Sequence, residues 1–104
     1  MTAEMTRPDM RRATRFDVTF PTIFDRPDGS EFASTIANIS AHGFMLADEV
    51  GMHKGERVSL RLPIAGRIEG FVVWAHNGRT GFEFERIIPQ TEFVQMIDIL
   101  TGKV

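Results

Sequence analysis

The stretch that decides the fold is residues 57–84, RVSLRLPIAGRIEGFVVWAHNGRTGFEF. Residues 57–62 alternate apolar and polar side chains, as a strand does when one of its faces is buried. Asn77-Gly78 favours a tight β-hairpin, because both residues tolerate the positive φ that such a turn requires. Strand-like residues flank this dipeptide on both sides, at 68–74 and 81–84. The stretch therefore predicts antiparallel strands joined by short turns.

The residues before this stretch predict three further strands. Residues 16–20 alternate apolar and polar side chains, and residues 22–24 are compatible with an extension of that strand beyond Pro21. Residues 31–39 predict the second strand and residues 43–46 a short third one.

Strand alternation also assigns side chains to faces, because successive side chains of a strand point to opposite sides. In residues 31–39 it places Asn38 on the same face as Ile36. In residues 68–74 it places Trp74 on the same face as Val72.

The period of the pattern changes near the C-terminus. After Pro89, apolar residues recur at positions 93, 96, 97 and 100, which is the spacing of one helix face. Gly102 is placed to end this helix. About six short strands followed by one helix predict a mainly β fold, a small six-stranded antiparallel barrel with a C-terminal α-helix.

The bulk composition excludes several classes of function. A chain of 104 residues is one small domain, and the absence of cysteine excludes disulfides, thiolate catalysis and cysteine-based metal sites. The three histidines do not have a metal-ligand spacing, and no nucleophile–base arrangement is visible, so we expect neither a metal site nor an enzyme. No apolar run could cross a bilayer and no secretory signal is visible, which predicts a cytoplasmic protein without membrane insertion.

The excess of positive over negative charge is confined to the N-terminus. Residues 1–15 hold four arginines against two acidic residues, and the remaining chain holds 8 basic against 12 acidic residues. This balance argues against general binding of DNA or RNA, which needs a basic footprint. We expect residues 1–10 to be a flexible tail. Arg11 and Arg15 follow it, spaced so that two guanidiniums can wrap an anion.

The second candidate motif is Asn38-Ile39-Ser40-Ala41-His42-Gly43, which separates two predicted strands. By itself it favours a β-turn, since Asn, Ser and Gly are turn formers. A ligand-binding interpretation is also open. On a strand Asn38 and Ser40 would share a face, the carboxamide could pair with a base edge, and Gly43 would let the backbone approach a ligand.

Together, Arg-x-x-x-Arg before the first strand and Asn-x-Ser-x-x-Gly between two later strands resemble the ligand signature of PilZ domains, the bacterial receptors for cyclic di-GMP. The resemblance covers residues 11–104 and implies a PilZ-like barrel with a flexible N-terminal arm. It also implies that cyclic di-GMP is the ligand and that no other cofactor is bound. By the resemblance, Arg11 and Arg15 contact the phosphates and guanines, and Arg12 adds a third contact. Asn38, Ser40 and Gly43 then bind the guanine side of the ligand.

Trp74, the only tryptophan, has two interpretations. It is either an aromatic residue of the core or barrel end, which is the commoner case, or a platform on which a guanine stacks. His42, inside the motif, is more typical of an exposed turn residue than of a ligand contact.

The leading hypothesis is a cyclic di-GMP receptor that signals to an effector protein, as a monomer or a ligand-dependent dimer. In the PilZ family such receptors regulate motility or biofilm formation. Two alternatives remain. One is a PilZ-fold protein–protein interaction module that acts without nucleotide, and the other is a barrel that binds single-stranded nucleic acid.

Overall fold

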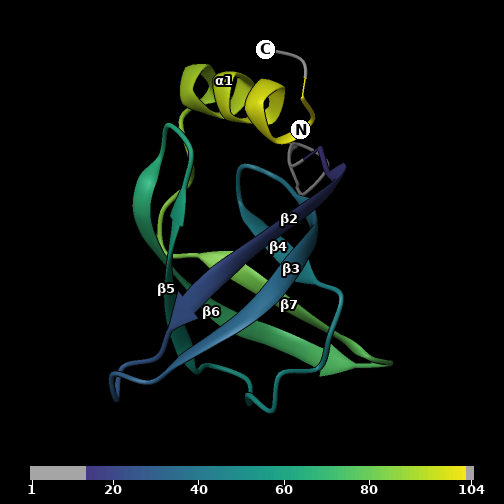
Figure 1. Ribbon diagram of the computed structural model, residues 1–104, viewed down its shortest axis with the longest axis vertical. Coiled ribbons are helices and arrows are strands. Elements are labelled where there is room, and N and C mark those ends of the chain that lie inside the picture. Colours follow the sequence, from purple (N-terminus) through teal and green to yellow (C-terminus); the bar gives the residue numbers. More distant parts are fainter. Residues whose placement is uncertain (1–13, 103–104) are drawn as a thin grey trace, which may run out of the picture.

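The protein is a closed six-stranded antiparallel barrel with one C-terminal helix, which confirms the predicted fold (Figure 1). The structure, a computed structural model, describes residues 14–102. The predicted tail, residues 1–10, and the predicted contacts Arg11 and Arg12 lie outside the described residues. The strands are β2 (Phe16–Asp25), β3 (Glu31–Ile39), β4 (Gly43–Leu46), β5 (Arg57–Leu62), β6 (Gly66–His76) and β7 (Arg79–Phe84), and the helix is α1 (Gln90–Leu100).

The strand order around the barrel is β2-β3-β4-β7-β6-β5, and a narrow contact closes it. Asp25 and Ser59 form the single registered pair between β2 and β5. Figure 1 shows α1 lying across one end of the barrel, near the start of β2. The helix buries Phe93, Met96 and Ile97 in the core. It therefore supplies apolar cover at an end that the strands alone leave open.

Phe44 stands at the centre of an aromatic cluster in the core. Its side chain is 1% exposed, and its ring centroid lies 4.8 Å from that of Phe82, 5.4 Å from that of Phe84 and 5.9 Å from that of Phe24. These partners come from β2 and β7, so one side chain of the short strand β4 joins opposite parts of the barrel wall. Aromatic pairs at these separations stabilise a core beyond their area burial.

The faces that strand alternation predicted for Asn38 and Trp74 are wrong, because a β-bulge precedes each of these residues. Ile36 pairs with Leu46 and Asn38 with Met45, so Ala37 has no counterpart in β4. In the same way Val72 pairs with Phe82 and Trp74 with Gly81, so Val73 has no counterpart in β7. An extra residue shifts the register by one position and reverses the face of the residues beyond it.

Both side chains consequently leave the face of the core. Ile36 and Val72 are buried, whereas Asn38 and Trp74 are half-buried on the outer wall of the barrel. The register then aligns a set of outward positions across five neighbouring strands, called here the outer row: Asp17, Asn38, Met45, Gly81 and Trp74.

The central place of Phe44 gives a stability prediction. Phe44→Ala should lower the free energy of unfolding by about 3–5 kcal/mol, because it removes a ring from a closely packed core and leaves a cavity. Urea denaturation followed by circular dichroism measures the change. Ile23→Ala is the matched control, because Ile23 is 50% exposed on β2, and it should change stability by less than about 1 kcal/mol. Equal losses in the two variants would contradict the assigned core.

Candidate ligand-binding site

A hydrogen bond joins the start of β2 to the end of β3. The Arg15 Nη1 atom donates to Asn38 Oδ1 at 2.8 Å, across 23 residues of sequence. Strand pairing brings them together, since Asp17, two residues after Arg15, is the registered partner of Asn38. The Asn38 Nδ2 atom lies 3.6 Å from Met45 Sδ on the next strand. The Asn38 carboxamide is therefore held on the outer wall with a guanidinium beside it.

Ser40 forms the turn that follows Asn38. It lies beyond the end of β3 and is only 1% exposed. Its Oγ atom accepts a hydrogen bond from the His42 N–H at 3.1 Å, and its own N–H donates to the Gly43 carbonyl at 2.8 Å. The turn interpretation of the motif is thus confirmed, and the strand face expected to be shared by Asn38 and Ser40 is not formed.

Gly43 is required by the neighbouring strand. A Cβ atom at this position would lie 2.1 Å from the Phe82 carbonyl oxygen and 3.0 Å from the Glu83 Cα atom. No side chain fits at such distances, so the pairing of β4 with β7 explains this glycine without reference to a ligand. The sequence alone does not reveal this approach, because it joins residues about 40 positions apart.

Backbone hydrogen bonds tie the motif turn to the end of β7 and to the segment between β7 and α1. The His42 carbonyl accepts from the Phe84 N–H at 2.8 Å, and the Ala41 carbonyl accepts from the Ile88 N–H at 3.0 Å. The turn that follows Asn38 is thereby fixed to the chain that leads into the helix.

The sequence of this chain matches a known domain family. The PilZ domain family matches residues 9–101. This chain belongs to the PilZ domain family. PilZ domains in general are effector modules for cyclic di-GMP. They act as binding or adaptor domains and are generally non-enzymatic. No curated protein sequence matches the chain.

Solved PilZ structures share the fold. The PilZ domain of CeSA from a cellulose-synthesizing bacterium has a TM-score of 0.62 at 20% identity, with 88% of this chain and 98% of that chain covered. The Bacillus subtilis inhibitor of motility, MotI/DgrA, has a TM-score of 0.63 at 21% identity, with 86% of this chain covered. The PilZ chain described here spans about half, 49%, of MotI/DgrA.

Trp74 lies on the same outer wall as Asn38, with Met45 and Gly81 between them. The indole packs on the β7 backbone, since a Cβ atom on Gly81 would lie 2.3 Å from the Trp74 Cε2 and Nε1 atoms. Met45 is not among the residues predicted from the sequence. The available signal is its place between buried Phe44 and Leu46, which turns its side chain outward.

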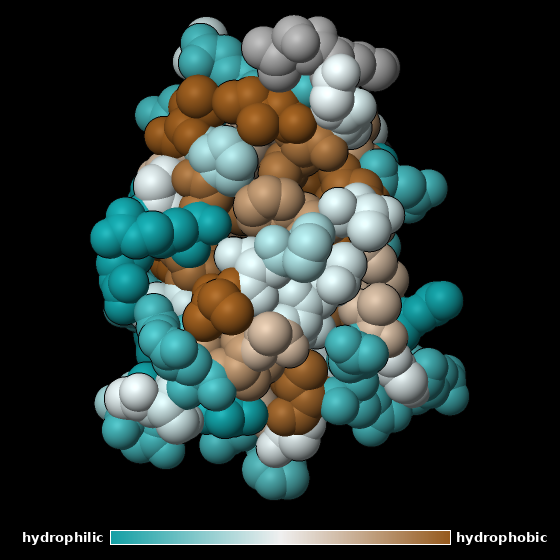
Figure 2. All heavy atoms as spheres, in the orientation of Figure 1, coloured by the Kyte–Doolittle hydropathy of each residue, from teal (hydrophilic) through white to brown (hydrophobic). Residues whose placement is uncertain are grey.

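A hollow of about 330 Å³ lies beside the motif turn, under α1. Thr14, where the described chain begins, forms part of its wall together with Ala41 of the motif. The other lining residues are Phe16, Gln90, Phe93, Val94, Ile97 and Asp98. Figure 2 shows apolar atoms gathered at this end of the molecule. The start of β2, the motif and the helix therefore meet around one space.

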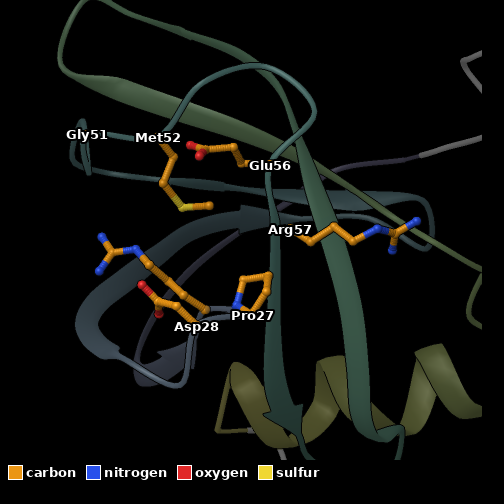
Figure 3. A pocket seen from close by; sticks show the side chains of 7 residues that line it. Pro27, Asp28, Gly51, Met52, Glu56 and Arg57 are labelled. Atoms are coloured by element: carbon orange, nitrogen blue, oxygen red, sulfur yellow. The ribbon is translucent and has the colours of Figure 1, made fainter.

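A second hollow, of about 530 Å³, contains none of the predicted site residues (Figure 3). It lies between the β2–β3 turn and the loop before β5, at the other end of β2 from Arg15. In that turn, hydrogen bonds from the Ser30 Oγ and N–H groups, with a smaller effect of the nearby Arg26 charge, lower the pKa of Asp28. These bonds stabilise the turn itself.

Two further findings concern residues 14–102 only. In this range no group of three or more His, Asp or Glu side chains is arranged to hold a metal ion. Nor does the range include a helix that is long and apolar enough to span a membrane.

Gly43→Ala tests the structural role of the motif glycine. We expect the free energy of unfolding of the ligand-free protein to fall by about 1–3 kcal/mol, because the added methyl group collides with the β7 backbone. Thermal and urea denaturation measure the loss. Arg15→Ala, a change at an exposed residue of the same site, should stay within about 0.5 kcal/mol of the wild type. A Gly43→Ala protein as stable as the wild type would contradict the close approach.

Proposed function

We propose that this PilZ domain is a cytoplasmic receptor for cyclic di-GMP that signals to an effector protein. The observation that carries the proposal is the 2.8 Å hydrogen bond between Arg15 and Asn38. It joins the arginine motif to the Asn-x-Ser-x-x-Gly motif, although 23 residues of sequence separate them. Membership of the PilZ family supports cyclic di-GMP as the ligand.

The arginines supply the charge that a cyclic dinucleotide requires. Cyclic di-GMP carries two phosphate charges and two guanine bases, and guanidinium groups bind phosphates and the O6/N7 edge of guanine in a bidentate manner. Arg15 is exposed beside Asn38. Arg11 and Arg12 precede it by four and three residues, and we assign them to the same ligand. The functional unit in this proposal runs from Arg11 to the C-terminus.

Asn38 is the base-reading residue in this assignment. Its carboxamide offers both a donor and an acceptor, and Arg15 holds the acceptor oxygen in the ligand-free protein. A ligand that draws Arg15 toward a phosphate would release this oxygen for a guanine edge. Ser40 and Gly43 support the site by forming the turn that follows Asn38. Trp74, on the same outer wall, is assigned to stacking.

The hollow under α1 supports a route from ligand to partner. Thr14 lines this hollow, and the next residue, Arg15, contacts Asn38. A ligand that holds the arginine segment in one position would therefore also hold Thr14 in place on the wall of the hollow. Val94 of α1 lines the same hollow and is 48% exposed. A partner protein, or a second copy of the chain, that binds this surface more tightly in the ligand-bound state would read the signal.

Arginine substitutions test the ligand assignment. Arg11→Ala and Arg15→Ala should each weaken cyclic di-GMP binding by about 1.5–3 kcal/mol, because each removes charge-assisted hydrogen bonds to the ligand. Isothermal titration calorimetry measures the affinity, and its stoichiometry separates one bound ligand from a pair. Arg61→Ala is the matched control, because Arg61 is an exposed arginine on β5, outside the outer row.

Two results would contradict the proposal. The first is the absence of heat and of chemical-shift changes at Arg15 and Asn38 at high micromolar cyclic di-GMP. The second is equal affinity of the wild type and both arginine variants, which would remove Arg11 and Arg15 from the site. Capture of the same partner with and without nucleotide would instead favour a module that acts independently of the ligand.

A further inference from the structure

Met45 is the one methionine of residues 14–102 whose side chain is not buried. The chain holds six methionines and no cysteine. The other two methionines within the described range, Met52 and Met96, are 6% and 0% exposed. Met45 is half-buried on the outer wall of the barrel. Because exposure decides which sulfur an oxidant reaches, oxidation at sulfur in the folded barrel falls on Met45.

The Met45 sulfur contacts the carboxamide that the proposed site uses. The Asn38 Nδ2 atom donates to Met45 Sδ at 3.6 Å, because the two residues are registered partners on β3 and β4. A thioether is a weak acceptor, so Asn38 can exchange this bond for one to a base at little cost. The other half of the carboxamide, Oδ1, accepts from Arg15 at 2.8 Å. The sulfur of Met45 therefore sets how readily the Asn38 donor is released.

Oxidation converts this weak acceptor into a strong one. A sulfur lone pair attacks one oxygen of hydrogen peroxide, the S–O bond forms, the O–O bond breaks, and the second oxygen leaves as water with both protons. The sulfur loses the two electrons that the peroxide gains, and the product is methionine sulfoxide. Its oxygen lies one bond from a sulfur that is already 3.6 Å from Asn38 Nδ2. The sulfoxide can thus accept a stronger hydrogen bond from the same N–H group.

We infer that Met45 is a site of reversible oxidation by peroxides, and that its sulfoxide lowers the affinity of the site for a guanine-containing ligand. The sulfoxide oxygen occupies the Asn38 donor while Arg15 occupies the acceptor, so neither half of the carboxamide is left for a base edge. The inference rests on the proposed function, in which Asn38 reads a guanine, and Met45 itself is not a ligand contact in it. Methionine sulfoxide reductases, one for each sulfoxide epimer, restore the thioether.

Peptide mass spectrometry tests the chemical step. The folded, full-length chain is treated with hydrogen peroxide, digested and compared with an untreated sample. We expect Met45 to gain one oxygen atom while Met52 and Met96 stay unmodified, because both are buried in the core. The treated protein should keep the thermal denaturation midpoint of the untreated protein, since the modified side chain lies outside the core. Oxidation of Met52 or Met96 ahead of Met45 would overturn the inference.

Isothermal titration calorimetry with cyclic di-GMP tests the effect on binding. Oxidation of Met45 should weaken binding roughly fivefold, the scale of one hydrogen bond that the ligand has to displace. Treatment with the two sulfoxide reductases should restore the affinity. Met45→Gln should weaken binding to a similar degree without peroxide, because its carboxamide oxygen is a permanent acceptor beside Asn38.

Two variants separate Met45 from the other oxidisable residues. Met45→Leu keeps the apolar volume and cannot form a sulfoxide, so it should bind as the untreated wild type does, both before and after peroxide. Met10→Leu removes the methionine that precedes Arg11 in the sequence, and it should remain as sensitive to peroxide as the wild type. An equal loss of affinity in peroxide-treated Met45→Leu would assign the effect to another residue and overturn the inference.

The outcomes distinguish this inference from the proposed function. Full affinity of a wild-type protein whose Met45 is oxidised would overturn the inference and leave the receptor assignment intact. Absence of binding heat from the untreated protein would overturn the proposed function, and the effect of the sulfoxide on the ligand with it.

Discussion

The close approach of β4 to β7 at Gly43 is the constraint on which the rest of the structure depends. Where a Cβ atom would meet the Phe82 carbonyl oxygen at 2.1 Å, the two backbones pair without an intervening side chain. This pairing stacks Phe44 on Phe82 inside the barrel. It also brings the motif turn within reach of the Phe84 and Ile88 N–H groups. The core, the site and the approach to the helix are thus fixed together.

The architecture was predictable from local patterns. Residues 57–62 alternate cleanly and become β5, Asn77-Gly78 becomes the β6–β7 turn with positive φ at both residues, and the apolar spacing after Pro89 becomes α1. Each of these signals arises within a few residues of sequence. Six short strands followed by one amphipathic helix predicted a small antiparallel barrel, which is the observed fold.

The faces of Asn38 and Trp74 were not predictable in the same way. The bulges at Ala37 and Val73 depend on the register of neighbouring strands, and alternation within one strand cannot report it. The two sequence motifs were visible as residue types and spacings, but the contact between Arg15 and Asn38 exists only because β2 and β3 pair. Ser40 is buried in the turn that follows Asn38, where its hydroxyl oxygen accepts a hydrogen bond from the His42 N–H.

The single registered pair between β2 and β5 has a consequence for the order of folding. The β2–β3 hairpin and the β5–β6–β7 meander each join strands that are adjacent in sequence, so loop closure costs them little entropy. The Asp25–Ser59 pair and the β4–β7 pairing instead span more than thirty residues. We therefore expect the two local units to form first and the seam to close last. The outer row crosses the β4–β7 pairing, so this wall of the barrel is complete only when the late seam has closed.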